Sequence, residues 1–259
     1  MSSIELNRRD FLRLPILLSG GDGTFIPPQE KEYEPKPFNV TTLTFHEIES
    51  SSQIQDVLYP LLNEGMTPIS VHTICQAFQG ETDLSRSNTS LLITLDDGLK
   101  SQLKAIDAIK EIEQGLEITI PLLFAVITKF APRDDNTDPN IPSFDDKVHE
   151  YFTRGDILDI LKNPQYDIAN HTFHHARLSD LPDDEVKGEL SISQRRINSL
   201  YAEAGRSDCP NVLVYPEGAY NQSVINTVKQ YKIPLAFSTE PNSGYSQSTR
   251  HHLGRFGKT

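Results

Sequence analysis

Two short segments carry side chains whose types and spacing could perform hydrolytic chemistry. Asp96 and Asp97 are adjacent and precede Gly98, and His171 and His175 lie four residues apart. Two imidazoles and one carboxylate suit a divalent metal such as zinc and leave positions open for water and substrate. The second carboxylate would then be free to act as a base. Taken alone, the first segment is more simply a turn with an Asp cap, and the second a pair of surface or core histidines.

Both segments follow stretches whose apolar pattern predicts buried strands. Short apolar runs alternate with amphipathic helical patterns from residue 38 onward. Such runs are typical of parallel strands that are covered on both faces. The expected strands are 40–45, 91–95, 120–127, 166–169, 212–215 and 235–238. The expected helices are 53–63, 101–113 and 183–204, with shorter helices capped by Thr153 and Asn221.

This alternation favours an α/β fold, and its unit count predicts a distorted (β/α) barrel of about seven parallel strands. In such folds the chemistry lies at the carboxyl ends of the strands. The Asp pair, the His segment 171–175 and the segment 215–218 all follow expected strands, and His46 follows the first one. We therefore expect these four segments to converge at one rim.

Three motifs, in order, resemble the polysaccharide deacetylase family (the NodB homology domain, carbohydrate esterase family 4). Thr94-Leu95-Asp96-Asp97-Gly98 resembles the family's Thr-Phe-Asp-Asp-Gly motif, with leucine in place of phenylalanine. His171-Thr172-Phe173-His174-His175 matches its His-Thr/Ser-x-x-His motif. Tyr215-Pro216-Glu217-Gly218 resembles its Tyr-Pro-Tyr-Gly motif, with glutamate in place of the second tyrosine. The similarity extends over roughly residues 40–240, and it implies a NodB-type barrel.

The resemblance implies a metal-dependent hydrolase that removes N-acetyl groups from an N-acetylglucosamine-type polysaccharide. It assigns Asp97, His171 and His175 to one divalent metal ion, with zinc first and nickel, cobalt or iron as alternatives. It assigns the role of general base to Asp96. The metal would polarise the acetyl carbonyl and lower the pKa of its bound water.

The third motif and the general acid complete the implied site. Tyr215, Pro216 and Glu217 would form the oxyanion and substrate region, with the backbone N–H of Glu217 as an oxyanion donor. Most of the family takes its acid from a Leu-x-His motif near the carboxyl terminus, and no clean copy is present here. The ending 251–256 looks more like that of the subgroup that acts on poly-N-acetylglucosamine, which carries a His after its first strand. We therefore expect His46 to be the acid.

His251 and His252 are the alternative acids. Val214 occupies the place where many family members carry an arginine that braces the base, as an apolar residue does in the same subgroup. His72 and His149 belong to no constellation and are expected on the surface.

Two other functions fit the same residues. The fold and metal could instead act on O-acetyl esters, peptidoglycan or small cyclic amides, or the domain could be catalytically degenerate and bind a polymer or a partner. The chain has 24 Lys+Arg against 36 Asp+Glu, a formal net charge of −12. That balance disfavours nucleic acid and anionic lipid as partners. The resemblance implies a carbohydrate polymer as the substrate. With no Trp in the chain, sugar stacking would fall to tyrosines and phenylalanines, namely Phe45, Phe173, Tyr215 or Tyr220.

The amino-terminal residues predict export. Paired arginines at 8 and 9, followed by a short apolar run to residue 18, resemble a twin-arginine signal. Residues 19–37 are rich in Gly, Pro and charge, as linkers are. We therefore expect a signal and linker over 1–37, a catalytic domain over 38–259, and a periplasmic or extracellular location, with the cytoplasm as the alternative. No apolar run reaches the roughly 18 residues of an integral membrane segment.

Overall fold

The computed structural model describes residues 35–258, except 88, 131–149 and 242–243. The chain divides into two compact units, Met1–Glu32 and Tyr33–Thr259, and every described residue belongs to the second. The twin-arginine-like segment and His149 lie outside the described residues. Within the described ranges, no helix is long and apolar enough to cross a membrane.

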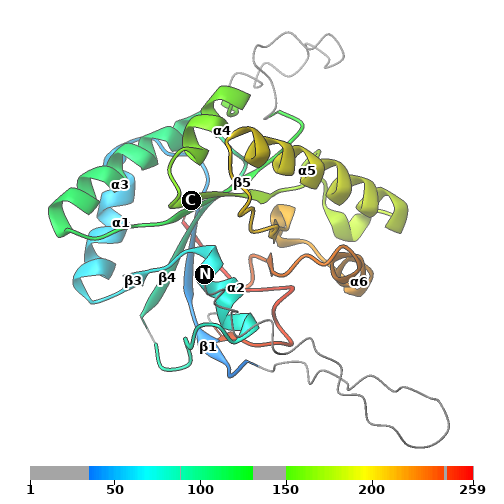
Figure 1. The fold of residues 1–259 in the computed structure, drawn as a ribbon, viewed down its shortest axis with the longest axis horizontal. Helices are drawn as coiled ribbons and strands as arrows, with labels where there is room; N and C mark the ends of the chain where they lie inside the picture. The colour runs from blue at the N-terminus through cyan, green and yellow to red at the C-terminus, as the bar shows by residue number, and fades with distance from the viewer. Residues whose placement is uncertain (1–34, 88, 131–149, 242–243, 259) are drawn as a thin grey trace, which may run out of the picture. The chain divides into compact units, whose positions relative to one another are not determined.

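The described residues form one curled sheet of parallel strands with helices packed on it (Figure 1). Seven strands lie side by side in the order β10-β2-β4-β5-β6-β7-β8. Their bounds are β2 Thr41–Phe45, β4 Ser90–Leu95, β5 Leu122–Val126, β6 Tyr166–Asn170, β7 Leu213–Val214, β8 Ala236–Phe237 and β10 Phe256–Lys258. β3 (Thr67–Pro68) pairs only with β4, and β1 (Phe38–Asn39) pairs antiparallel with β9 (Gly244–Tyr245). The predicted α/β class with about seven parallel strands is confirmed.

The end of the chain joins the two edges of the sheet. Leu253 bridges to β8, because its N–H donates to Ala236 O at 2.8 Å and its carbonyl accepts from Ser238 N–H at 2.7 Å. Three residues later β10 pairs in parallel with β2 at the other edge. The sheet is therefore a distorted barrel. β10 was not among the expected strands, because Phe256–Lys258 is only three residues long and contains no apolar run.

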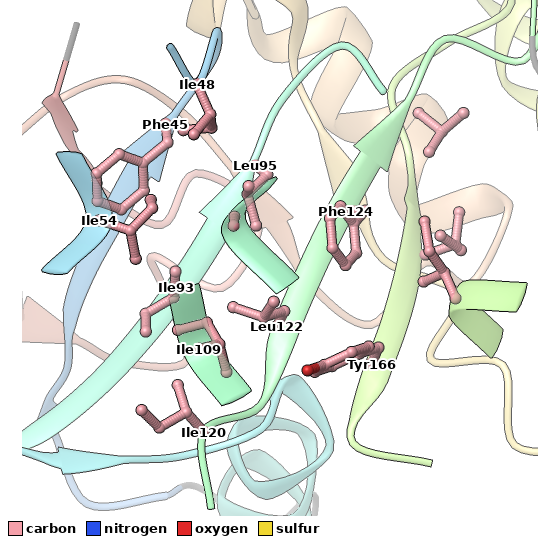
Figure 2. Packing of buried hydrophobic residues seen from close by; sticks show 14 of the residues in the cluster. Phe45, Ile48, Ile54, Ile93, Leu95, Ile109, Ile120, Leu122, Phe124 and Tyr166 are labelled. Carbon is pink, nitrogen blue, oxygen red and sulfur yellow. The ribbon is translucent and has the colours of Figure 1, made fainter. Parts of the chain in front are cut away.

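Both faces of the central strands are buried, which accounts for their continuous apolar runs. On β5, Leu122, Phe124 and Val126 belong to one hydrophobic cluster, whereas Leu123 and Ala125 belong to another. Figure 2 shows the first cluster, in which side chains of the strands meet those of the covering helices.

Six α-helices connect the described strands, and five of them were expected. Their bounds are α1 Ser51–Asn63, α2 Val71–Gln79, α3 Leu103–Leu116, α4 Arg154–Leu161, α5 Asp183–Glu203 and α6 Gln222–Gln230. The side chains of Thr153 and Asn221 cap α4 and α6, as the sequence predicts. α2 was not among the expected helices, because it is short and rich in β-branched residues. It is delimited by the Ser70 cap and by the left-handed Gly80.

A buried carboxylate organises the amino end of β6, away from the expected rim. Asp167 Oδ1 accepts hydrogen bonds from the Tyr201 hydroxyl at 3.0 Å and from Arg206 Nη2 at 2.9 Å. His72 Nε2 lies 3.3 Å from Asp167 Oδ2. The expectation that His72 is merely a surface residue is therefore wrong, because its half-buried ring is part of this network.

The hydrogen bond to Asp167 raises the pKa of His72, and burial opposes it less strongly. A raised pKa favours the protonated imidazole in the folded state. The pair therefore stabilises the fold fully below the ordinary histidine pKa of about 6.5, and this contribution is lost as the pH rises through the folded-state value. We expect His72→Gln to lower the free energy of unfolding more at about pH 5.5 than at about pH 8.5, as measured by urea denaturation. Equal losses at the two pH values would contradict this prediction.

Candidate metal centre and hydrolytic site

Asp97, His171 and His175 meet at the carboxyl edge of the sheet. Asp97 Oδ1 lies 3.4 Å from His171 Nε2 and 3.3 Å from His175 Nε2. The ligand atoms of all three lie within 4.8 Å of one another, and no other group of three or more His, Cys, Asp or Glu residues does so in the described part of the chain. Burial alone would raise the pKa of Asp97, but the hydrogen bonds from the two histidines outweigh it and hold that pKa well below its usual range.

The turns that present these side chains use left-handed backbone. Asp97 has φ 77° and Gly98 φ 73°, and Thr172 and His175 have φ 64° and 62°. Residues other than glycine seldom adopt this region, at a cost of about 1–3 kcal/mol each at strained sites. The surrounding contacts must hold them there; for example, Asn170 Oδ1 accepts the Thr172 N–H at 2.9 Å.

Further contacts orient the rings of His171 and His174. His171 Nδ1 lies 2.8 Å from Val214 O, a carbonyl that can only accept, so Nδ1 carries a proton and Nε2 is the ring nitrogen that faces Asp97. Glu189 of α5 accepts the His174 N–H at 2.8 Å and approaches His174 Nδ1 at 2.6 Å. The ring of His174 is thus directed to α5, although it lies between His171 and His175 in sequence.

Asp96 is braced by an arginine that the sequence analysis did not assign. Arg255 Nη1 and Nη2 each donate to one carboxylate oxygen of Asp96 at 2.8 Å. The two side chains are 1% and 3% exposed, and Arg255 also donates to Thr94 Oγ1 and Ser238 O. Burial would raise the pKa of Asp96, but the Arg255 charge, the nearby His171 and the Arg255 hydrogen bonds together outweigh it and lower that pKa. Asp96 is therefore ionised at neutral pH.

The brace occupies a different position in the chain from the one the family usually uses. Val214 stands at the usual position of that arginine, and its backbone carbonyl accepts the hydrogen bond from His171 Nδ1. Arg255 lies 159 residues from Asp96 and reaches it after the chain has bridged β8 at Leu253. The sequence held one signal for Arg255. Residues 251–256 resemble the ending of the subgroup that acts on poly-N-acetylglucosamine, but this resemblance does not identify the contact between Arg255 and Asp96.

His46 and Asp96 stand on neighbouring strand ends. Phe45 pairs with Leu95 across the β2–β4 ladder, and the Asp96 N–H donates to Phe45 O at 2.8 Å. The imidazole of His46 is exposed at this rim, and its charge contributes to the lowered pKa of Asp96. The expected acid and base therefore flank one another.

The two alternative acids differ in their surroundings. His251 Nε2 lies 3.1 Å from Ile233 O, and burial lowers the pKa of His251 to about 4. An imidazole with that pKa is neutral at neutral pH, and its single N–H is donated to Ile233 O. The ring of His252 stacks on that of Tyr220, with centroids 5.5 Å apart.

The third motif forms a tight turn, η5 (Pro216–Gly218). Tyr215 is fully buried and its hydroxyl donates to His251 O at 2.9 Å, so its side chain supports the rim from within. Pro216 is buried beside it. Glu217 is exposed, has φ 53° and pairs with Arg177. Its backbone N–H makes no hydrogen bond to any described residue, so it is available as a donor.

The expectation that Phe45 and Tyr215 provide stacking surface is wrong, because both are fully buried. Phe173 and Tyr220 are partly exposed. One face of Phe173 is covered by the Arg196 guanidinium, 4.6 Å from the ring centroid. Little aromatic surface at this rim is open to a sugar.

Metal binding tests the ligand group directly. We expect Asp97→Ala to weaken the binding of zinc at least about 100-fold, because two neutral imidazoles remain without their anionic partner. His174→Ala is the matched control, since its ring bonds to Glu189, and its zinc affinity should equal that of the wild type. Isothermal titration of the metal-free proteins measures both. Unchanged affinity in Asp97→Ala would refute the ligand assignment.

Comparisons with known proteins agree with this architecture. A search of the curated proteins finds no match. Among solved structures, IcaB from Ammonifex degensii superposes with a TM-score of 0.66 at 16% identity, covering 86% of this chain and 92% of that one. A de-N-acetylase from Aggregatibacter actinomycetemcomitans gives 0.63 at 16% identity, covering 85% and 94%. A polysaccharide deacetylase from Bacillus cereus gives 0.66 at 16% identity and covers 85% of this chain, which spans only 65% of that protein.

The family comparison extends over most of the chain. The sequence model of the family described as polysaccharide deacetylase matches residues 34–236, which include β2, the Asp pair, the His loop and η5. The match leaves out Arg255, although this residue braces the carboxylate of the first motif. The solved structures share the fold, and the family match covers well over half of the 259 residues. The chain belongs to the polysaccharide deacetylase family.

Proposed function

We propose that this protein is a metal-dependent hydrolase that removes N-acetyl groups from an N-acetylglucosamine-type polysaccharide. The proposal rests on two adjacent carboxylates that have different surroundings, one suited to bind a metal and the other to act as a base. Asp97 faces two imidazole nitrogens, whereas Asp96 is held ionised by Arg255. The family and the shared fold with a de-N-acetylase support the same reaction class.

The ligand group fits a divalent metal. Its donors are one carboxylate oxygen and two imidazole Nε2 atoms, and the Nδ1 proton of His171 is already committed to Val214. This donor set suits zinc first, with nickel, cobalt or iron as alternatives. When bound, the ion would polarise the acetyl carbonyl and acidify a water molecule.

The base and the acid are supplied by this chain's own residues. Asp96 accepts the proton of the attacking water, and the Arg255 charge keeps Asp96 ionised until then. The backbone N–H of Glu217 donates to the oxygen that becomes negative in the transition state. His46 protonates the departing amine, a step that an amide requires because an amine anion is a very poor leaving group.

The charge of the chain is compatible with this reaction. Removal of acetyl groups converts a neutral polymer into a cationic one, and a chain of net charge −12 does not repel either form. Export through the twin-arginine-like segment at residues 7–18 belongs to the same proposal, since it would bring the enzyme to a polymer outside the cytoplasm.

Acetate release tests the reaction. We expect metal-loaded wild type to release acetate from N-acetylglucosamine oligomers and Asp96→Asn to lower kcat by about 10²–10⁴-fold, because the amide cannot accept the proton. Zinc affinity of the variant should stay within about threefold, since Asp96 is not in the ligand group. Asp159→Asn, an exposed carboxylate on α4, is the matched control and should be fully active. No acetate release from metal-loaded wild type would overturn the proposal.

A comparison of amide and ester substrates tests whether His46 is the general acid. An alkoxide leaves without prior protonation far more readily than an amine. We expect His46→Ala to lower kcat/KM for the amide by about 10²-fold or more, and for an O-acetylated analogue by less than about tenfold. Parallel assays with N-acetyl and O-acetyl oligomers measure this difference. Equal losses on both substrates would argue against His46 as the acid.

A further inference from the structure

Gln102 is a fully buried amide between the two strand ends that carry Asp96 and His46. It closes the short turn η2 (Lys100–Gln102) that follows the Asp pair, and it is 0% exposed. Its Nε2 donates to Asp96 O, and to His46 O at 2.9 Å. An amide nitrogen carries two hydrogens, so one side chain serves both carbonyls.

The nitrogen and the oxygen of this side-chain amide differ in their hydrogen bonding. Nε2 makes both of its hydrogen bonds, whereas Oε1 has no partner among the described residues. A buried acceptor left unsatisfied costs about 1–3 kcal/mol. An apolar side chain of the same length would avoid that cost. The amide at position 102 therefore points to a requirement for its two donors, and that requirement concerns the geometry of the strand ends.

The segment around Gln102 anchors the whole loop that begins at His46. Ser101 Oγ accepts the Ile48 N–H at 3.3 Å, and Lys104 Nζ donates to Glu49 O at 2.9 Å. Among these anchors, Gln102 is the side chain that contacts His46 itself.

Asp96 has other supports and His46 has fewer. The Asp96 carboxylate is held by both guanidinium nitrogens of Arg255, and its N–H is held by Phe45 O. The described hydrogen bonds of His46 include the one from Gln102 to its carbonyl and none to its ring. Loss of the Gln102 donors would therefore act mainly on His46.

We propose that Gln102 is a positioning residue that sets the place of His46 relative to Asp96, and hence of the acid relative to the base. This inference rests on the proposed function. Gln102 is buried and touches no substrate; it acts through the backbone of His46. A displacement of about 1 Å in a catalytic group can cost about 10²-fold in rate, so one hydrogen bond at this point has a large effect on amide cleavage.

Hydrogen exchange tests the positioning without reference to activity. Gln102→Met keeps the length of the side chain and removes both donors and the unpaired acceptor. We expect amide exchange of residues 45–50 to become about tenfold faster, and that of residues 170–176 to stay unchanged. Gln165→Met, the same change at an exposed site before β6, is the control and should alter neither. Unchanged exchange of residues 45–50 in Gln102→Met overturns the inference.

Kinetics tests the consequence for the acid. We expect Gln102→Met to lower kcat/KM for the N-acetyl substrate by about 10–100-fold and for the O-acetyl substrate by less than about threefold. A partly unfolded sample would lower both equally, so the ratio isolates positioning. The double variant with His46→Ala should be no slower on the amide than His46→Ala alone.

Equal losses on the two substrates, or additive losses in the double variant, overturn the inference. No acetate release from metal-loaded wild type overturns the proposed function instead, and the exchange of residues 45–50 then decides the positioning role alone.

Discussion

The buried ion pair between Arg255 and Asp96 is the contact on which the rest of the site depends. Two charges removed from water are tolerated only when they meet each other and their remaining polar atoms are hydrogen-bonded. Here the guanidinium uses Nη1, Nη2 and Nε on Asp96, Thr94 and Ser238. Removal of one partner would leave the other charge buried and unpaired, at a cost of about 3–5 kcal/mol. The same contact links residue 255, just before β10, to the first motif, so the segment that closes the barrel also keeps the buried Asp96 ionised.

The candidate site and the Asp167 network that stabilises the fold lie at opposite ends of the strands. The carboxyl edge carries left-handed turns and a buried amide with an unpaired oxygen, both of which are costly. The amino end of β6 carries the Asp167 network, in which Tyr201, Arg206 and His72 surround a single carboxylate. Barrels of this kind tolerate strain at one edge because the shared hydrophobic layers on both faces of the sheet hold the strands in place.

Much of this arrangement could be predicted from the sequence. The strands that precede the Asp pair and the His loop are short apolar runs, and the helices between them have regular apolar spacing, so local patterns were sufficient to order them. The ligand group followed from motifs whose members are close in the chain. Short elements escaped prediction, namely α2 with nine residues and β10 with three. The burial of Phe45 and Tyr215 also escaped prediction, because aromatic rings are equally compatible with a core and with an open groove.

The sequence by itself determined the family, the order of the strands and the residues that face the candidate metal, because each depends on neighbours within a few positions. Only the tertiary structure decided what holds those residues. Arg255 meets Asp96 across 159 positions, and Gln102 joins the ends of two strands that are paired through the sheet. Such contacts depend on how the barrel closes, and closure depends on the packing of all its layers together. A pattern in one segment of the chain cannot encode it.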